Sequence, residues 1–241
     1  MIVNNLQELL SLKPSSVGNT LIHQEELIRW FDLLDAVWIH DGDPTKPHAK
    51  TTQGLCTNAF FDCLAVLENM NLSDIFANQL ALRLKYAMGE EALKKVGYVV
   101  GSPMAAITFA HDVARYIGAP RNSFAEKDPD HKNEMMWKRR TIAEGTHVLK
   151  IEELMTTSGT TEAVERAIVK GNKYPVIFDP FVGTIILRPP KFEPTYGGKR
   201  VVALIAKEVW AVEREKCTLC AQGSKLIEKP KLNWGELTGK N

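Results

Sequence analysis

The sequence predicts an α/β protein with a mostly parallel, twisted sheet that is flanked by helices. Short runs rich in β-branched residues recur along the chain, and segments with apolar residues at three- and four-residue spacing separate them. The chain has 241 residues, 44% of them hydrophobic, which is enough for a buried core. Because strands that alternate with helices pair in parallel, we expect binding sites at the carboxyl ends of the strands.

The composition argues against several classes of protein. The formal net charge is +1, so no global field attracts nucleic acid or an anionic membrane. No apolar run approaches the roughly 20 residues that a membrane span needs, and the first residues lack the basic start of a secretory signal. The four cysteines fit a reducing compartment better than a disulfide scaffold. We therefore expect a cytoplasmic protein that binds neither nucleic acid nor membrane.

We expect three parts: an N-terminal helical segment at 1–47, a core at 48–206 and a C-terminal tail at 207–241. In the first part, Pro14 to Gly18 has the residues of a loop. Apolar residues then recur on one face from Gln24 to Ile39, which predicts a helix over that range. Asp41 to Pro44 would end this helix. We expect the segment to cover the binding site as part of a small hood.

The first half of the core contains a strand, a loop of small residues and a helix. Residues 96–100 have the composition of a strand, and Gly101 to Ala106 form the loop that follows. A helix is predicted from Ile107 to Ile117, where Gly118 would end it. Taken alone, this loop is a weak signal, because many loops between a strand and a helix carry glycine and proline.

A basic loop precedes the central strand. Residues 122–127 predict a short strand with a charged end, and residues 128–134 predict a polar loop. The cations of this region that could act on a phosphate group are Lys127, His131, Lys132, Lys138, Arg139 and Arg140. For each of them the alternative is a solvated position on the surface of a hairpin.

The central stretch combines two acids with a loop of hydroxyl residues. Val148 to Ile151 predicts a strand, and Glu152 and Glu153 follow where that strand should end. A turn from Thr156 to Thr161 then leads into a helix from Glu162 to Val169. The amides at a helix N-terminus and the threonine hydroxyls form an anion site, whereas the carboxylates can accept hydrogen bonds from a sugar diol or hold a divalent cation.

Three further strands are predicted at 174–178, 182–187 and 201–206. The tail then carries Cys217 and Cys220. A structural zinc site needs four ligands, and the sequence shows no second Cys/His pair with close spacing. We therefore expect no metal held by protein side chains alone. A pair shared with a partner subunit, a redox dithiol and two plain reduced cysteines remain open.

The central stretch resembles the phosphoribosyl-diphosphate (PRPP) motif of the type I phosphoribosyltransferases. That motif is a hydrophobic strand, two acids, a hydrophobic residue, any residue, and then Thr-Thr-Gly-x-Ser/Thr. The chain follows this order from Val148 to Thr160, but the second acid is Glu153 instead of Asp, and Ser158 replaces the loop glycine. The extra methylene moves a carboxylate by about one bond length, and a Cβ in the tight turn can exclude a positive φ or crowd a phosphate.

Other segments resemble the orotate phosphoribosyltransferases of that family. The matches are the polar turn before Phe60 and Phe61, the small-residue loop after residue 100 with alanines for two glycines, the Phe-x-Glu-Lys strand end, the basic loop and the Cys-x-x-Cys tail. Together they cover residues 48 to 235. After residue 178, however, the family has an arginine that pairs with the orotate carboxylate, and this chain has Asp179-Pro180-Phe181. Lys173 or Arg188 could replace that arginine, or the pocket could accept an uncharged base.

The resemblance implies a type I phosphoribosyltransferase-like fold with a small hood built from N- and C-terminal segments. It also implies a homodimeric pentosyltransferase that moves 5-phosphoribose from PRPP to orotate and releases pyrophosphate, in pyrimidine nucleotide biosynthesis. Mg²⁺ would arrive with PRPP and could also contact Glu152 and Glu153. The alternatives are a transferase for a different base, and a catalytically impaired relative that binds PRPP or a nucleotide in a regulatory or scaffold role.

The resemblance assigns a role to each candidate residue. Catalysis would use Lys127, Lys132, Glu152 and Glu153, and the 5′-phosphate would bind to Thr156, Thr157, Ser158, Gly159 and Thr160. The diphosphate would lie on Gly101, Ser102, Ala105 and Ala106, beside the basic residues Lys138, Arg139 and Arg140. The base would contact Phe60, Phe61, Pro180 and Phe181.

Overall fold

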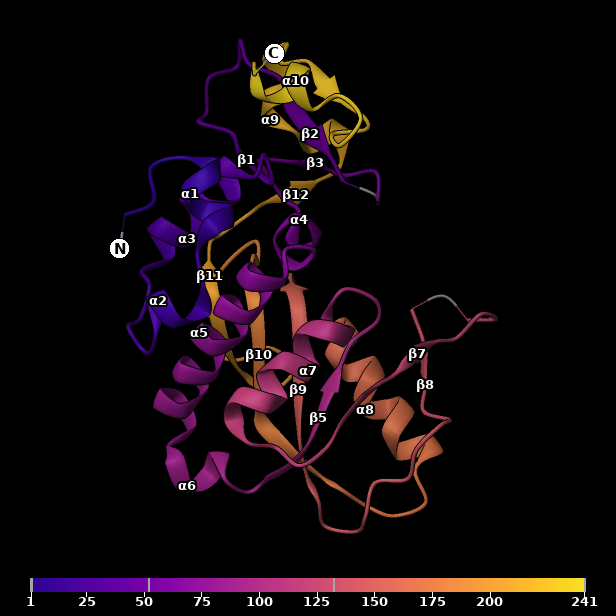
Figure 1. Cartoon of the computed structure of the whole chain (residues 1–241). Coiled ribbons are helices and arrows are strands. Elements are labelled where there is room, and N and C mark those ends of the chain that lie inside the picture. The colour runs from indigo at the N-terminus through magenta and orange to yellow at the C-terminus, as the bar shows by residue number, and fades with distance from the viewer. Residues whose placement is uncertain (1, 52, 132, 241) are drawn as a thin grey trace.

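A five-stranded parallel sheet forms the centre of the computed structural model, which describes residues 2–51, 53–131 and 133–240 (Figure 1). In spatial order the strands are β11 (Arg200–Ala206), β10 (Ile177–Leu187), β9 (His147–Met155), β5 (Val96–Gly101) and β6 (Asn122–Phe124). Every neighbouring pair is parallel. The predicted α/β fold with a mostly parallel sheet is confirmed, and the strands β5 and β9 point toward the hood (Figure 1).

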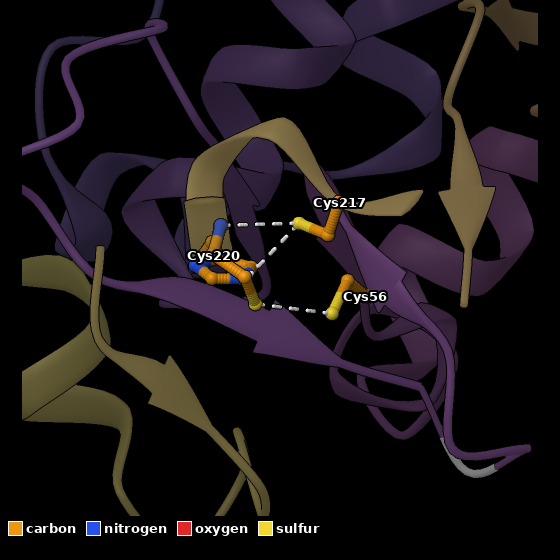
Figure 2. Close-up of side chains that lie close together, drawn as sticks. Cys56, Cys217 and Cys220 are labelled. Atoms are coloured by element: carbon orange, nitrogen blue, oxygen red, sulfur yellow. Dashed lines mark hydrogen bonds between the residues drawn. The ribbon is translucent and has the colours of Figure 1, made fainter. Parts of the chain in front are cut away.

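The hood is a second, smaller sheet built from both ends of the chain. Its strands are β12 (Ala211–Val212), β3 (Cys56–Thr57), β2 (His48–Lys50) and β13 (Leu226–Ile227). The short helices η1 (Arg214–Lys216), α9 (Thr218–Ala221) and α10 (Trp234–Thr238) complete it. Cys56, Cys217 and Cys220 lie together between β3 and α9 (Figure 2). The expected hood is confirmed in part: Trp38 packs with Ile227 in the hood, but the helix Gln24–Leu33 of the expected N-terminal hood segment contacts β11 of the central sheet. The three-part division of the chain stays a prediction, and β2 and β3 of the expected core lie in this hood sheet.

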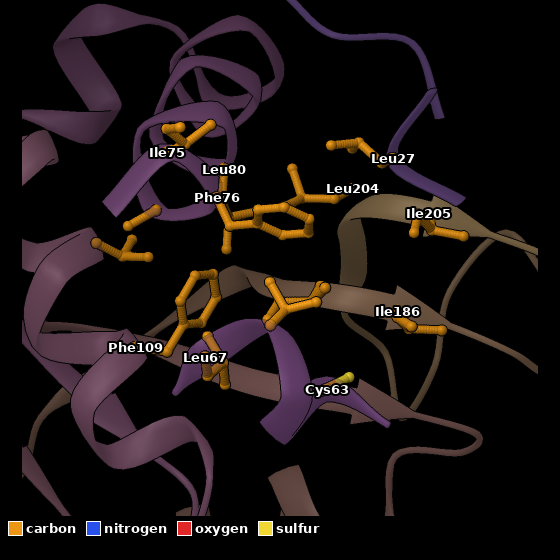
Figure 3. Close-up of a cluster of buried hydrophobic side chains, with 14 of the residues drawn as sticks. Leu27, Cys63, Leu67, Ile75, Phe76, Leu80, Phe109, Ile186, Leu204 and Ile205 are labelled. Carbon is orange, nitrogen blue, oxygen red and sulfur yellow. The ribbon is translucent and has the colours of Figure 1, made fainter. Parts of the chain in front are cut away.

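Helices cover both faces of the central sheet. On one face lie α3 (Gln24–Leu33), α5 (Met70–Met88) and α7 (Ala106–Ile117), and on the other lies α8 (Gly159–Gly171). Phe76 of α5 and Phe109 of α7 meet Ile186 and Leu204 of the sheet in the main buried cluster (Figure 3). Burial of such large apolar side chains is the main source of stability for this arrangement.

The remaining elements connect these layers. They are α1 (Leu6–Ser11), α2 (Pro14–Val17), the paired strands β1 (Val37–Ile39) and β4 (Ala59–Phe61), α4 (Cys63–Leu67), α6 (Glu90–Leu93), and the hairpin of β7 (Glu126–Lys127) and β8 (Met135–Met136). Within the described ranges, no helix combines the length and the apolar character that a membrane span requires.

The expected helix from Gln24 to Ile39 is wrong in its second half. The helix α3 ends at Leu33, Asp35 takes a positive φ of 50°, and Val37 begins β1. Val37 pairs with Phe61 of β4, so that the apolar residues of this stretch pack as a strand. Tertiary pairing therefore overrides the helical spacing, since periodicity over a few residues does not distinguish the two structures.

The two strands expected at 174–178 and 182–187 form the single strand β10. Its register against β9 shifts between Phe178 and Val182, where the chain has Asp179 and Pro180. Proline lacks the amide that a regular ladder needs, and a bulge lets the strand continue past it. As a result the carboxyl end of β10 is at Leu187, nine residues beyond the expected end at Phe178.

Candidate active site

The carboxyl ends of β5, β9 and β10 meet beneath the hood. Cys63, the first residue of α4, lies in this region. Its thiol is buried, and burial raises its pKa well above the ordinary value. Glu153 of β9, Arg188 after β10, and Asp62 and Lys231 of the hood side are the charged groups that act on this thiol. Groups from both parts of the fold therefore converge on one place.

Glu152 is buried at the centre of this region, with 3% of its surface exposed. Its Oε2 accepts a hydrogen bond from the hydroxyl of Ser102, and its Oε1 accepts one from Thr161 at 3.0 Å. Burial raises the pKa of Glu152 to about 7, against the lowering effect of these two hydroxyls. The carboxylate thus joins β9 to the loop after β5 and to the first turn of α8.

Glu153 has different surroundings, because successive residues of a strand face opposite sides. Its carboxylate accepts no side-chain hydrogen bond within the described residues, and burial raises its pKa while the charge of Lys127 lowers it. Both acids were expected where the strand ends, but β9 continues to Met155 and contains them. The two carboxylates therefore cannot act as one adjacent pair on the same face.

The loop of hydroxyl residues leads directly into α8. The helix begins at Gly159, with Ser158 at the N-cap, and not at Glu162 as expected. Thr157, Gly159 and Thr160 are exposed. The first backbone N–H groups of a helix have no partner within it, and the helix dipole favours an anion there. The start of α8 is therefore exposed at the place where the sequence predicts the phosphate loop, and its binding of an anion stays a prediction.

A turn from β10 to β11 contacts this loop. Gly197 has a φ of 55°, and a Cβ at this position would lie 2.8 Å from Cβ of Ser158 and 2.3 Å from Oε1 of Glu162. The hydroxyl of Ser158 donates to the same Glu162 oxygen at 2.5 Å. The contact of Gly197 with the candidate phosphate loop is a finding of the structure.

The small-residue loop after β5 supports the opposite side of the site. Gly101 lies so close to α7 that a Cβ would sit 2.5 Å from the carbonyl oxygen of Ala106. Ser102 is buried on Glu152, Ala105 is the N-cap of α7, and Ala106 is already helical and fully buried. Of the four expected diphosphate contacts, Ala106 is therefore a packing residue, since no part of it reaches the surface.

The basic residues divide into two groups. Lys127 ends β7 and acts on Glu153, so it belongs to the site region. Lys138 and Arg140 are exposed, and Arg139 forms an ion pair with Glu126 at 2.6 Å. The expected catalytic Lys132 lies outside the described residues. The roles assigned to these cations remain predictions.

The expected base pocket needs a correction. Pro180 and Phe181 lie in the amino half of β10, where Phe181 contacts the Arg200 guanidinium at 4.9 Å, and they are far from the carboxyl end of the strand. Phe61 is a core residue that packs on Phe31. Phe60 alone borders a cavity of about 610 Å³ in the hood, whose other lining residues are Lys50, Thr51, Gly54 and 228–232. A larger cavity of about 760 Å³ lies elsewhere, between the β7–β8 hairpin and α8.

Of the two residues that could replace the family arginine, Arg188 lies at the carboxyl end of β10, whereas Lys173 precedes the strand. Arg188 follows β10 directly, its backbone N–H donates to the Met155 carbonyl at 2.8 Å, and burial lowers the pKa of its guanidinium. Its Nε is buried without a hydrogen-bond partner, and no carboxylate of the described chain forms an ion pair with it. A buried guanidinium with a free donor is costly unless an anion binds to it.

Comparisons with known proteins agree with this geometry. No family model matches the chain. The orotate phosphoribosyltransferase of Thermoanaerobacter sp. (strain X514) is 29% identical over 214 residues, covering 86% of this chain and 97% of that protein. The orotate phosphoribosyltransferase of Pelotomaculum thermopropionicum is 29% identical over 198 residues, covering 80% and 93%.

Solved structures support the same fold. The crystal structure of orotate phosphoribosyltransferase from Aeropyrum pernix matches with a TM-score of 0.50 at 15% identity, covering 75% of this chain and 93% of that one. Because identity is this low, the likeness concerns the fold alone. The sequence relatives, the fold and the motif order agree with one another: the chain has a type I phosphoribosyltransferase-like fold and is similar in sequence to the orotate phosphoribosyltransferases, which are pentosyltransferases, with a diverged PRPP motif.

Proposed function

We propose that this phosphoribosyltransferase moves 5-phosphoribose from PRPP to orotate and releases pyrophosphate. Arg188 is the residue that favours orotate as the base. Its guanidinium lies at the carboxyl end of β10, and its buried Nε has no hydrogen-bond partner. Arginine binds a carboxylate through two parallel hydrogen bonds, and orotate differs from uracil by a carboxylate. The curated relatives named above carry orotate in their names, which supports the same substrate.

In this proposal the 5′-phosphate binds at the start of α8, where Thr157, Gly159 and Thr160 are exposed. The ribose lies over β9 beside Glu153, and the diphosphate lies toward Ser102 and Ala105. Lys127 is a cation whose charge acts on Glu153, which places it beside this region. The protein positions the reactants, excludes water and stabilises the charge that develops on the leaving diphosphate.

Mg²⁺ is the cofactor that we propose to arrive with PRPP. The donor chemistry fits: Glu153 has carboxylate oxygens with no side-chain donor on them in the described residues, whereas both oxygens of Glu152 already accept hydroxyl groups. Glu153 would therefore contact the ion, and Glu152 would hold the loops in place. When bound, the cation neutralises charge on the diphosphate. We further propose a cytoplasmic homodimer, which light scattering would test.

The test is a turnover assay that follows pyrophosphate release from PRPP with orotate or with uracil. Arg188→Gln should lower kcat/KM for orotate by roughly 10- to 100-fold, the value of a lost hydrogen bond to a charged group, and should leave any reaction with uracil unchanged. Lys173→Gln is the matched control, because Lys173 precedes the amino end of β10 and lies over Tyr174 at 5.0 Å. An equal effect of both variants would overturn the role of Arg188.

A binding relative without turnover is the second candidate. One feature favours it: Glu152 is closed off from solvent by two hydroxyl groups. Calorimetric titration with PRPP and Mg²⁺, followed by a turnover assay, distinguishes the transferase from the binding relative. Binding that Thr157→Asp abolishes, followed by turnover, supports the transferase, and binding without turnover on any base supports the second candidate. No binding of PRPP would contradict both.

A further inference from the structure

Four side chains of the hood meet at one point, and we propose that they bind a structural zinc ion. His48, Cys56, Cys217 and Cys220 each offer one ligand atom, and these four atoms lie within 4.8 Å of one another. The expectation of no metal at protein side chains rested on the absence of a second Cys/His pair with close spacing. The structure supplies that pair from β2 and β3, where His48 and Cys56 stand on neighbouring strands.

Three of the six distances between the ligand atoms are close to those of a tetrahedral site. The sulfurs of Cys56 and Cys220 are 3.7 Å apart, and Nε2 of His48 is 3.5 Å from the sulfur of Cys217 and 3.3 Å from that of Cys220 (Figure 2 shows the three cysteines). Zinc bonds near 2.3 Å to sulfur and 2.0 Å to nitrogen give ligand atoms about 3.8 Å and about 3.6 Å apart in a tetrahedron. Only small movements are needed to place an ion at the centre.

The histidine is held in the orientation and tautomer that a metal requires. Ser224 donates its hydroxyl hydrogen to the carbonyl oxygen of Lys46 at 2.6 Å, and its oxygen lies 2.8 Å from Nδ1 of His48. That oxygen therefore accepts the proton on Nδ1, which leaves the lone pair of Nε2 directed at the sulfurs. A second contact of this kind is a regular feature of histidines that bind zinc.

Three thiolates and one imidazole select zinc among the common metals. Calcium and magnesium prefer oxygen ligands, whereas sulfur and nitrogen in a tetrahedral set suit zinc. His48, Cys56 and Cys217 are buried and Cys220 is partly exposed, so all four coordination positions are filled by protein. A closed site of this kind is structural, and the thiol protons leave to solvent when the ion binds.

The ion would fasten the two ends of the hood together. Cys56 and Cys220 are 164 residues apart in sequence, and the hood strands that bring them together have only two or three residues each. Such a small sheet has little apolar surface to bury, and closing so long a loop costs conformational entropy. Zinc would supply the missing stabilisation and hold in place the hood that borders the candidate active site.

The test measures zinc in the full chain purified without a histidine tag. Mass spectrometry of the native protein and elemental analysis should both give about one zinc per chain. Cys56→Ser and Cys217→Ser should each lose it, and Cys63→Ser should keep it, because Cys63 is a buried cysteine outside the cluster. Equal loss in all three variants, or a reduced wild-type chain that takes up no added zinc, would overturn the proposal.

Two further measurements distinguish a tetrahedral zinc site from a site of other geometry and from a disulfide. Cobalt added to the zinc-free chain should give the visible bands and the thiolate charge-transfer band of a tetrahedral sulfur site. Ser224→Ala should weaken zinc binding by roughly 10- to 100-fold in competition with a chelator while the stoichiometry stays at one. A disulfide between Cys56 and Cys220 in the protein as isolated under reducing conditions would contradict the metal site.

Discussion

Ser102 and Glu152 connect the carboxyl ends of β5 and β9, since the serine hydroxyl donates to Oε2 of the buried glutamate. Thr161 of α8 donates to the other oxygen at 3.0 Å. One carboxylate therefore joins the loop expected to bind the diphosphate to the helix expected to bind the 5′-phosphate. These two hydrogen bonds contribute to holding the two loops at a fixed separation.

The stability of the protein should depend on pH through Glu152. Burial raises its pKa from the ordinary value of 4.5 to about 7. Because the folded chain then holds the proton more tightly than the unfolded chain, this contribution is complete below pH 4.5, decreases as the pH rises, and is lost above about pH 7. Urea denaturation should show the wild type losing on the order of 3 kcal/mol relative to Glu152→Gln across that range.

Glu152→Gln is the control for this comparison, because glutamine is a buried polar group of the same size that does not titrate. Acids that do not interact with Glu152 titrate equally in both proteins and cancel in the difference. A difference in the free energy of unfolding that stays constant between pH 4.5 and pH 8 would mean that Glu152 is not the titrating group.

Gly101 and Gly159 should respond to alanine in opposite directions. A Cβ at Gly101 would lie 2.5 Å from a helix carbonyl, so Gly101→Ala should cost roughly 1–3 kcal/mol of stability. At Gly159 the nearest atom would be 3.8 Å away, and alanine in the first turn of α8 should leave stability unchanged or raise it by up to about 1 kcal/mol. Thermal unfolding of the two variants measures both signs.

Gly197 and Gly198 form a second matched pair. Both have positive φ, 55° and 73°, so alanine strains the backbone at either position. Only Gly197 has neighbours, Ser158 and Glu162, that a Cβ would displace. Gly197→Ala should therefore raise the Kd for PRPP about tenfold, near 1.4 kcal/mol, whereas Gly198→Ala should lower stability alone. Equal PRPP affinity in the two variants would show that the turn does not support the phosphate loop.

The buried Lys150 should destabilise the folded protein when its ion-pair partner Glu165 is removed. It is 1% exposed and forms an ion pair with Glu165 of α8, which also binds Lys199 at 3.1 Å. Glu165→Gln leaves the ammonium buried and should cost about 3 kcal/mol at pH 7, whereas Lys150→Met, which removes the charge itself, should cost less than half as much. Urea denaturation of the two variants gives this comparison.

The pH dependence of the Glu165→Gln variant provides an independent check. Burial already lowers the pKa of Lys150 in the wild type, against the effect of Glu165, so the variant should release the proton more easily. A lysine that folds with a lowered pKa destabilises the protein fully below that pKa, and the cost decreases as the pH rises from there toward the unfolded value of 10.5. The deficit of the variant should therefore shrink as the pH rises toward 10.5, and a constant deficit would contradict the assignment.

The sequence by itself determined the parts of the site that depend on neighbouring residues. The strand before Gly101, the start of the loop at Thr156 and the helix that follows it were all expected within a few residues. Their signals are local, because β-branched runs, helical periodicity and the turn preference of glycine act over distances of a few residues. The order of these segments along the chain was enough to indicate the family.

Only the tertiary structure decided which side chains complete the two sites. The bulge in β10 moves the end of that strand to Leu187, which brings Arg188 rather than Pro180 to the site. The pairing of β2 with β3 and β13 brings His48 next to cysteines about 170 residues away. Contacts at such separations depend on strand register and loop closure, and neither can be deduced from the residues next to each position in the chain.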